Sequence, residues 1–436
     1  MNIAILGFGR EGKSLLTFLK KTPPYRTADI TVLDKNPKLA SEFKRLYVPF
    51  RVGAGYLTRL ERFDIIFRSP GVPYTLPEIQ RARNKGVEIS SATKLFFDRA
   101  PREKLIGITG TKGKGTTASL LAHILKCANR RVILAGNIGK PMLDSIPAAR
   151  RADFVILELS SFQLQDLIES PRVAVVLDVF PDHLDAHRSL REYHDAKTNI
   201  VRFQKRGDAV FFLADNPRSR AIAQAGIAKK IAVHPKTKGV GKNAEMAAAV
   251  ARSLDVPQQT VQKAIATFRG LPHRLELVRV IRPSYSNVLK NIGIKFYDDS
   301  AATNPQATIA AIRSFREPLI LLAGGRDKGL DYHPLGNAIR AAKNVKSVVL
   351  FGENRQKIAR TLNEELGARK QELGIKPTDN LRSASKIAHK IAQSLVTNSQ
   401  SLVTILLSPA SASFDQFKSY VDRGEQFKKL VRALRR

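Results

Sequence analysis

The segment best suited to chemistry is TGTKGKGTT, at positions 109–117. An apolar run ending at Ile108 precedes it and an alanine- and leucine-rich helical pattern follows, which predicts strand, glycine-rich loop and helix in that order. Such a loop directs backbone N–H groups and a helix N-terminus at one place, where a phosphate group is favoured. Lys114 would reach the outer phosphates of a nucleotide, and the hydroxyl of Thr116 or Thr117 could meet Mg²⁺. We therefore predict a phosphate-binding loop, with a flexible surface turn as the alternative.

This segment departs from the strict phosphate-loop pattern at both ends. Ile108 stands where the first glycine belongs, and Gly115 follows the lysine directly. The residues expected to surround the phosphates are those of the loop and the first helical turn: Gly110, Thr111, Lys112, Gly113, Lys114, Gly115, Thr116 and Thr117.

A second glycine pattern, GFGREG at positions 7–12, follows the apolar run of residues 2–6. The next predicted strand, residues 30–33, ends at Asp34. This order is typical of a dinucleotide-binding turn, in which glycines let the backbone approach a diphosphate and a carboxylate holds ribose hydroxyls. The nucleotide stays open, because any ligand with a ribose and a diphosphate would fit. A glycine turn that serves only packing is the alternative.

Other polar residues also follow predicted strands. Glu158 ends the strand that begins at residue 154, and a carboxylate beside a phosphate loop is well placed to hold Mg²⁺. His183 lies among acidic residues after the strand 173–177, which suggests metal or phosphate chemistry, although a single histidine is more often structural. Polar clusters at strand ends are what open α/β sheets use to bind ligands.

The elements that must position these residues alternate between strands and helices along the whole chain, which predicts an α/β fold. A length of 436 residues is compatible with about three domains. We place the boundaries so that the domains span residues 1–97, 98–278 and 279–436. Two helices, near 242–254 and 257–268, are expected to precede the end of the middle domain.

The composition points to a cytoplasmic protein. No apolar run approaches the length of a membrane span, the N-terminus lacks the features of a signal peptide, and the single cysteine, Cys127, cannot form an internal disulfide. The net charge of +35 attracts polyanions, but the basic residues are spread along the chain. We therefore expect a solvated basic surface and no specific nucleic-acid partner.

Taken in order, the motifs resemble the Mur ligases, and within them the members that add D-glutamate. The segments that carry the resemblance are Ser69-Pro70-Gly71, TGTKGKGTT (109–117), GNIG (136–139), ELSSFQL (158–164), PDHLD (181–185), AK (196–197), GLPHRLE (270–276), DSAATN (299–304), GGRDKG (324–329) and SPASASFDQFKSYVDRG (408–424). They cover the whole chain, and ELSSFQL together with the last segment is highly specific.

The resemblance implies an ATP-dependent ligase of peptidoglycan precursor synthesis that joins D-glutamate to UDP-N-acetylmuramoyl-L-alanine. It implies a Rossmann-like N-terminal domain for the UDP-sugar, a central P-loop ATPase domain and a Rossmann-like C-terminal domain for the amino acid. The carboxylate of the sugar nucleotide would take the γ-phosphoryl group of ATP as an acyl phosphate. The amine of D-glutamate would then displace phosphate. We expect a monomer that works on these small-molecule substrates.

The resemblance also implies roles for single residues. Catalysis would involve Lys114, His183 and Lys197, and metal ligation Thr116, Glu158, His183 and Lys197. Lys197 is similar to a family lysine that CO₂ carbamylates, which implies two Mg²⁺ sites with the carbamate as a bridging anion. The UDP-sugar would contact Gly7, Gly9, Arg10, Glu11, Asp34, Gly71, Asn137, Ser160 and Gln163. ATP would also contact Asn243, Arg274 and Asp299, and D-glutamate would contact Thr303, Lys328, Ser413 and Tyr420.

Four departures from the family pattern stand out. Gly115 replaces a serine or threonine, Asp178 an asparagine and Ala301 a lysine, while Gly239-Val240 replace a His-Asn pair. We interpret the chain as a divergent, active member. The alternatives are a folylpolyglutamate synthetase-like ligase, favoured by Lys114-Gly115-Thr116, a nicotinamide-dependent dehydrogenase, favoured by the first glycine turn, and a basic nucleic-acid-binding NTPase, favoured by the charge.

Overall fold

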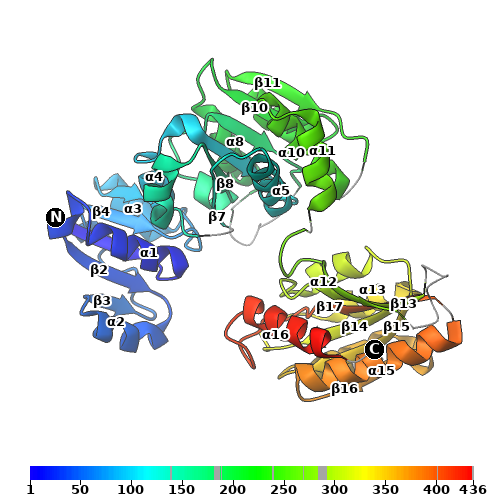
Figure 1. Ribbon diagram of the computed structural model, residues 1–436. Helices are drawn as coiled ribbons and strands as arrows, with labels where there is room; N and C mark the ends of the chain where they lie inside the picture. The colour runs from blue at the N-terminus through cyan, green and yellow to red at the C-terminus, as the bar shows by residue number, and fades with distance from the viewer. Residues whose placement is uncertain are drawn as a thin grey trace. The chain divides into compact units, whose positions relative to one another are not determined.

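The computed structural model describes residues 1–137, 140–180, 187, 189–237, 240–268, 270–282, 292–399 and 401–434. The chain divides into two compact units, Met1–Phe268 and Arg269–Arg436 (Figure 1). Each contains parallel β-sheet covered by helices on both faces, so the predicted α/β class is confirmed. The predicted domain limits at residues 97 and 278 stay a prediction.

The first sheet of unit 1 consists of five parallel strands in the order β3-β2-β1-β4-β5. Ile3 and Ile5 face one core and Ala4 and Leu6 the other, because side chains alternate along a strand. Helices α1, α2 and α4 cover one face and α3 the other. The elements are β1 (Asn2–Leu6), α1 (Arg10–Leu19), β2 (Asp29–Asp34), α2 (Ala40–Leu46), β3 (Phe50–Val52), β4 (Ile65–Arg68), α3 (Pro77–Asn84), β5 (Glu88–Ser90) and α4 (Ala92–Phe97).

The second sheet of unit 1 has six parallel strands in the order β11-β10-β9-β6-β8-β7. Helices α5, α10 and α11 pack on one face, and α6 to α9 pack on the other. The elements are β6 (Leu105–Thr109), α5 (Lys114–Cys127), β7 (Val132–Gly136), α6 (Ile146–Arg151), β8 (Phe154–Glu158), α7 (Ser161–Leu164), β9 (Val173–Val176), α8 (Leu190–Arg202), β10 (Ala209–Leu213), α9 (Pro217–Gln224), β11 (Lys229–Val233), α10 (Val240–Ser253) and α11 (Gln258–Thr267).

A buried ion pair joins the two sheets of unit 1. Arg68, the last residue of β4, is 1% exposed; its Nη1 donates to the carbonyl of Val72 at 2.7 Å and its Nη2 to that of Phe162 at 2.8 Å. The same Nη2 lies 3.3 Å from Asp166 Oδ2. One apolar core also runs continuously from Ile3 of the first sheet to strands of the second. The two sheets therefore form one packed body.

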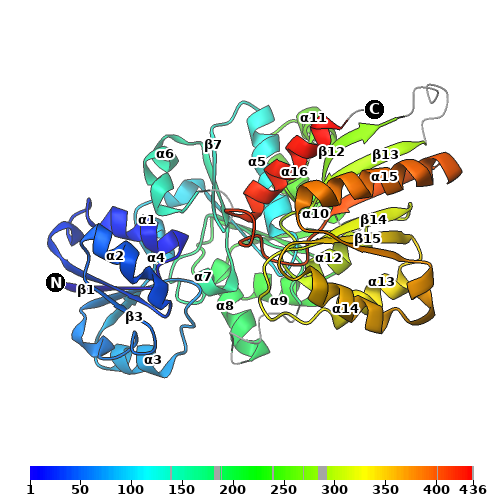
Figure 2. The ribbon, with the colours of Figure 1, turned by 90° about the horizontal axis from the view of Figure 1, so that it is seen from below.

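Unit 2 contains a six-stranded sheet in the order β12-β13-β17-β14-β15-β16, in which only β12 is antiparallel. Figure 2 shows α15 and α16 on one side of this sheet and α13 and α14 on the other. The elements are β12 (Glu276–Ile281), β13 (Gly293–Asp298), α12 (Pro305–Ile312), β14 (Leu319–Gly324), α13 (His333–Ala341), β15 (Val345–Phe351), α14 (Arg355–Glu365), β16 (Gly374–Pro377), α15 (Leu381–Ser399), β17 (Leu402–Leu407) and α16 (Tyr420–Ala433).

Among the described helices, none combines the length and the apolar character that crossing a bilayer requires.

The buried ion pair predicts a large loss of stability for Arg68→Met. The change leaves the Asp166 carboxylate buried without its counter-ion, so we expect the free energy of unfolding to fall by about 3–5 kcal/mol. Arg131→Met is the matched control, because Arg131 pairs with Asp153 while 72% and 32% of their side chains are exposed. That loss should be far smaller, because water already screens an exposed pair. Urea unfolding followed by circular dichroism measures both; equal small losses would contradict this role.

Candidate active site

The predicted phosphate loop lies between β6 and α5, at the carboxyl edge of the second sheet. Gly113 precedes the helix with a φ of +84°, in the left-handed region that favours glycine, and no side chain caps the helix. A Cβ atom at Gly113 would collide with Oδ1 of Asn243, on α10. The structure thus brings Asn243, predicted to contact ATP, against the loop. The uncapped first turn offers backbone N–H groups to an anion.

Two lysine side chains meet at this loop. Lys114 Nζ donates to the carbonyl oxygens of Gly110 at 2.9 Å and Thr111 at 3.1 Å. Lys197, on α8 and only 2% exposed, donates through its Nζ to the same Gly110 oxygen at 3.1 Å. Its Nζ also lies 4.6 Å from the ring centroid of Tyr193, whose hydroxyl is 2.8 Å from Thr111 Oγ1. Among the described residues, two lysine side chains therefore share one carbonyl oxygen of the predicted phosphate loop.

Glu158 ends β8, the strand next to β6, and its side chain is buried. Asn137 Nδ2 donates to Glu158 Oε1 at 3.1 Å. Glu158 Oε2 and Thr117 Oγ1 are buried and have no hydrogen-bond partner among the described residues. Buried carboxylate and hydroxyl oxygens without such a partner are suitable ligands for a hard cation such as Mg²⁺. Thr116 is half-buried, so Thr116 and Thr117 both stay candidates for the hydroxyl that meets Mg²⁺. His183, the other predicted metal ligand of this site, lies outside the described residues.

A pocket of about 370 Å³ opens at the carboxyl edge of the first sheet. Asp34 accepts hydrogen bonds from the backbone N–H groups of Phe8 at 2.7 Å and Asn36 at 2.8 Å, so it holds the glycine turn in place as well as lining the pocket. Besides the predicted residues Gly7, Gly9, Arg10, Glu11 and Gly71, the lining residues include Lys35, Tyr56, Ser69, Pro70, Val72 and Pro73.

A chain of hydrogen bonds joins this pocket to the second sheet. Gln163 Nε2 donates to Glu11 Oε1 at 2.9 Å, and Gln163 Oε1 accepts from the backbone N–H of Ser160 at 3.0 Å. Arg10 donates to the carbonyl oxygens of Gly136 at 3.2 Å and Asn137 at 3.4 Å. Arg10 and Glu11 of the pocket are therefore neighbours of Asn137, Ser160 and Gln163, which are predicted to contact the same sugar nucleotide.

Glu11 is unusual within the pocket because it is largely buried. Burial raises the pKa of its carboxyl group above the ordinary value, although Gln163 and nearby arginines oppose the shift. Its Oε2 atom has no hydrogen-bond partner among the described residues. This oxygen is suited to a ligand that brings a hydrogen-bond donor.

Asp178, which departs from the family pattern, takes part in an ion-pair group beside the phosphate loop. Lys242 Nζ lies 2.8 Å from Asp178 Oδ1 and 2.9 Å from Asp215 Oδ2. Burial lowers the pKa of Lys242, but the hydrogen bonds to the two carboxylates outweigh it and raise that pKa overall. Because the backbone carbonyl of Asp178 accepts from Thr111 N at 2.7 Å, Lys242 balances a charge directly under the loop.

In unit 2, the predicted ATP contact Asp299 follows β13 and is 7% exposed. Ser408 Oγ donates to its Oδ2 at 2.7 Å, and the backbone N–H of Leu275 donates to its Oδ1 at 3.3 Å. Burial raises the pKa of Asp299 to about 7. The carboxylate therefore holds the segment that carries Arg274, the other predicted ATP contact in this unit.

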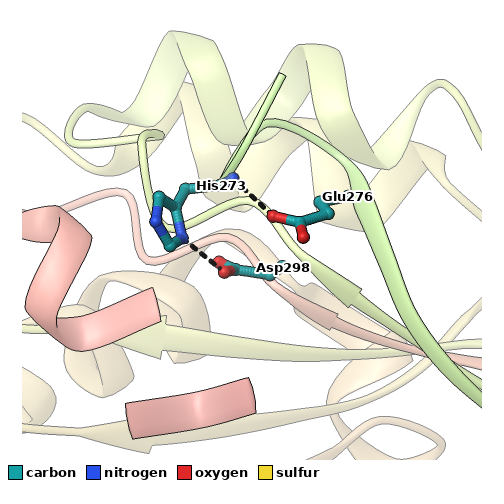
Figure 3. A group of neighbouring side chains, drawn as sticks. All are labelled: His273, Glu276 and Asp298. Carbon is teal, nitrogen blue, oxygen red and sulfur yellow. Dashed lines mark hydrogen bonds and ion pairs between the residues drawn. The ribbon is translucent and has the colours of Figure 1, made fainter. Parts of the chain in front are cut away.

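His273, Glu276 and Asp298 form a group next to these residues, in which His273 and Asp298 are buried and Glu276 is half-buried (Figure 3). His273 Nδ1 lies 2.7 Å from Asp298 Oδ2, and the backbone N–H of His273 donates to Glu276 Oε2 at 2.9 Å. The three side chains have the spacing of metal ligands, but Lys428 Nζ already lies 2.7 Å from Glu276 Oε2 and supplies a positive charge. We interpret the group as an anchor that fixes residues 270–276 to the sheet.

The predicted amino-acid residues follow neighbouring strands of the unit 2 sheet. Thr303 comes after β13, Lys328 after β14 and Ser413 after β17, so all three lie at one edge. Lys328 Nζ lies 5.9 Å from the ring centroid of Phe414, the residue after Ser413. Tyr420 begins α16, and its carbonyl oxygen accepts from Ser300 Oγ at 2.8 Å.

Sequence reasoning missed several residues that the geometry singles out. Arg68 carries a charge at the end of a buried strand directly before Ser69-Pro70-Gly71, and that position was an available signal. Tyr193 stands in the segment that contains Lys197, but its contact with Thr111 has no sequence signal. The ion pairs of Lys242 with Asp178 and Asp215 also have no sequence signal, because these partners lie far from Lys242 in the sequence.

The raised pKa of Asp299 predicts a pH-dependent stability. An aspartate in the unfolded chain ionises near pH 4, whereas Asp299 in the folded chain ionises at about 7. Between these values the folded protein keeps a proton that the unfolded chain releases, so stability falls as pH rises through this window and stays low above it. Asp299→Asn should remove this fall, on the order of a few kcal/mol. Urea midpoints at pH 5 and pH 8 check this; an unchanged difference between them would contradict it.

Models of three domains match the chain. A Mur ligase MurD-like N-terminal domain matches residues 1–91, a Mur ligase middle domain residues 108–278, and a Mur ligase glutamate ligase domain residues 286–410. Among solved structures, the UDP-N-acetylmuramate-alanine ligase MurC from Thermotoga maritima aligns with a TM-score of 0.55 at 19% identity, over 99% of both chains. A folylpolyglutamate synthase from Mycobacterium tuberculosis gives 0.56 at 15%, over 79% of this chain and 96% of its own. At these identities, the two structural similarities indicate a shared fold only.

Whole-length relatives are more similar in sequence. The UDP-N-acetylmuramoylalanine--D-glutamate ligase of Acetivibrio thermocellus is 37% identical, over 99% of this chain and 96% of its own length. The protein of the same name from Symbiobacterium thermophilum is 35% identical, over 99% and 98%. The resemblance deduced from the motifs is thus confirmed, and the chain belongs to the Mur ligase family.

Proposed function

We propose that this protein is an ATP-dependent ligase that joins D-glutamate to the free carboxylate of UDP-N-acetylmuramoyl-L-alanine, a step in peptidoglycan precursor synthesis. The name shared by the two whole-length relatives supports the pair of substrates. The observation that carries the chemistry is the meeting of Lys114 and Lys197 at the Gly110 carbonyl, beside the buried Glu158. We place the reaction in the cytoplasm and expect a monomer.

The first step makes a carboxylate reactive. A carboxylate oxygen attacks the γ-phosphorus of ATP, the bond to the β,γ-bridging oxygen breaks, and ADP leaves an acyl phosphate behind. Such a transfer needs alignment and stabilisation of negative charge, and Lys114 with the backbone N–H groups of the loop supplies both. Glu158, a threonine hydroxyl and a carbamate on Lys197 would hold Mg²⁺, which supplies further charge neutralisation when bound.

The second step forms the amide bond. The neutral amine of D-glutamate attacks the acyl carbon, phosphate leaves with one carboxylate oxygen, and the nitrogen loses a proton. The amino acid must present its amine while its two carboxylates are held. Lys328 with the hydroxyls of Thr303, Ser413 and Tyr420 suits this purpose, because cations and hydroxyls bind anions without engaging the amine.

Lys197 is the residue whose chemistry we expect to change. A neutral lysine amine adds CO₂ to give a carbamate and a proton, which turns a cation into an anion. The buried position of Lys197 beside Lys114 suits this change, because a carbamate there would place negative charge next to the Lys114 ammonium. The carbamate would also supply oxygen atoms for two Mg²⁺ sites.

The folylpolyglutamate synthetase-like alternative is favoured by Lys114-Gly115-Thr116 and shares the fold of the Mycobacterium tuberculosis enzyme. The direct test measures phosphate release from ATP with UDP-N-acetylmuramoyl-L-alanine and either D-glutamate, L-glutamate or no amino acid. We expect release that depends on D-glutamate and on the sugar nucleotide together. Release driven by a folate acceptor and L-glutamate instead would establish the alternative and reject the proposal.

Carbamylation predicts a distinctive rescue. Lys197→Ala should lower the rate roughly 100-fold or more, because the site loses the carbamate that would hold Mg²⁺ beside the phosphates. Added acetate should restore part of the activity by replacing the carbamate. Lys126→Ala, an exposed lysine on the last turn of α5, is the matched control and should keep the wild-type rate. A fully active Lys197→Ala enzyme would refute the role of this lysine.

A further inference from the structure

A closed triangle of buried polar atoms lies under two loops of unit 2. Asn354 Nδ2 donates to Tyr332 Oη at 2.7 Å and to Ser411 Oγ at 2.8 Å, and these two hydroxyl oxygens lie 2.9 Å apart. The three residues are 3%, 1% and 0% exposed. We call Asn354, Tyr332 and Ser411 the Asn354 network.

Asn354 also bonds to the loop after β14. Its Oδ1 accepts from the backbone N–H of Gly325 at 2.9 Å, and its own backbone N–H donates to the Gly325 carbonyl at 3.0 Å. Every hydrogen-bonding atom of the amide side chain therefore has a partner. One side chain, placed after β15, ties together the loops that follow β14 and β17.

These two loops carry predicted amino-acid contacts. Ser413 comes two residues after Ser411, and Lys328 three residues after Gly325. The loops also pair directly, because Arg326 N donates to the Ala412 carbonyl at 2.9 Å. A shift of Gly325 relative to Ser411 would thus move Lys328 relative to Ser413.

A second buried residue holds the other side of the β17 loop. Arg423, on α16 and 0% exposed, donates to the carbonyl oxygens of Ser411 at 3.0 Å and Ala412 at 3.2 Å. The backbone of Ser411 is therefore fixed from α16, and its side chain from Asn354. The β14 loop is held against it by the Arg326–Ala412 bond and by the two hydrogen bonds between Asn354 and Gly325.

We propose that Asn354 is a positioning residue for the amino-acid substrate: it sets the spacing between Lys328 and Ser413, and through this spacing the affinity for a dicarboxylic amino acid. This inference rests on the proposed function. Asn354 touches no substrate itself. Its effect should appear in the KM for D-glutamate and leave the KM for ATP unchanged. The phosphate loop belongs to the other unit, and the side chain of Asn354 bonds to Gly325, Tyr332 and Ser411 and, among the described residues, to neither predicted ATP contact of unit 2, Arg274 or Asp299.

The test compares two substitutions at one position. Asn354→Leu keeps the approximate size but removes all three side-chain hydrogen bonds, so we expect the KM for D-glutamate to rise roughly tenfold or more. Asn354→Asp keeps an acceptor for Gly325 N, and both hydroxyls can turn to donate to the carboxylate. Its KM should stay within about threefold of the wild type, even where burial of the charge lowers the melting temperature.

The variants separate positioning from general stability. Asn337→Leu is the matched control, since Asn337 is exposed on α13 and makes a surface hydrogen bond with Arg340; it should leave both KM values unchanged. If Asn354→Leu fails to fold, Tyr332→Phe removes one hydroxyl of the network and should raise the KM for D-glutamate roughly two- to fivefold.

Two outcomes would overturn the inference. One is a KM for D-glutamate that stays at the wild-type value in Asn354→Leu, or in Tyr332→Phe where the leucine variant does not fold. The other is a KM for ATP that rises in parallel. Wild-type turnover with D-glutamate is measured first, so a failure of the proposed function is recognised before any variant is compared.

Discussion

The carbonyl oxygen of Gly110 accepts hydrogen bonds from two lysine side chains, and the rest of the candidate active site is arranged around this point. Lys114 reaches it from the start of α5 and Lys197 from α8, so helices on opposite faces of one sheet place cations at the same atom. Gly110 belongs to the loop that the sequence predicts to bind phosphate, so both lysine side chains lie at this loop. Asn243 packs against Gly113 of this turn, and the Asp178 carbonyl accepts from the Thr111 N–H.

The pocket at the first sheet, the candidate site for a sugar nucleotide, is built on a different constraint: the two sheets of unit 1 are packed together. Arg68 and Asp166 are buried as a pair between them, and Gln163 links Glu11 to the segment that follows β8. Because that segment begins directly after Glu158, beside the phosphate loop, a ligand in the pocket and a phosphate at the loop would be held by one continuous body. This arrangement suits a reaction in which one end of a long substrate must stay fixed while its other end is phosphorylated.

Much of this arrangement could be predicted from the sequence, because the signals were local. The strand, loop and helix at residues 105–127 and the first glycine turn are each specified within one short segment. Long-range pairs gave no such signal: the contacts of Lys242 with Asp178 and of Asn354 with Ser411 join residues far apart in sequence. The antiparallel strand β12 was missed, because no strand was predicted at residues 276–281. Asp299, predicted only as an ATP contact, also anchors a backbone turn.

The central claim is that ATP activates a carboxylate before D-glutamate is joined to it. Transfer of an oxygen atom tests this claim most directly. UDP-N-acetylmuramoyl-L-alanine labelled with ¹⁸O in its free carboxylate is incubated with the protein, ATP and D-glutamate, and the released phosphate is analysed by mass spectrometry. Activation through an acyl phosphate predicts one labelled oxygen in each phosphate, because the carboxylate oxygen leaves with it. Unlabelled phosphate released together with the ligated product would contradict the account.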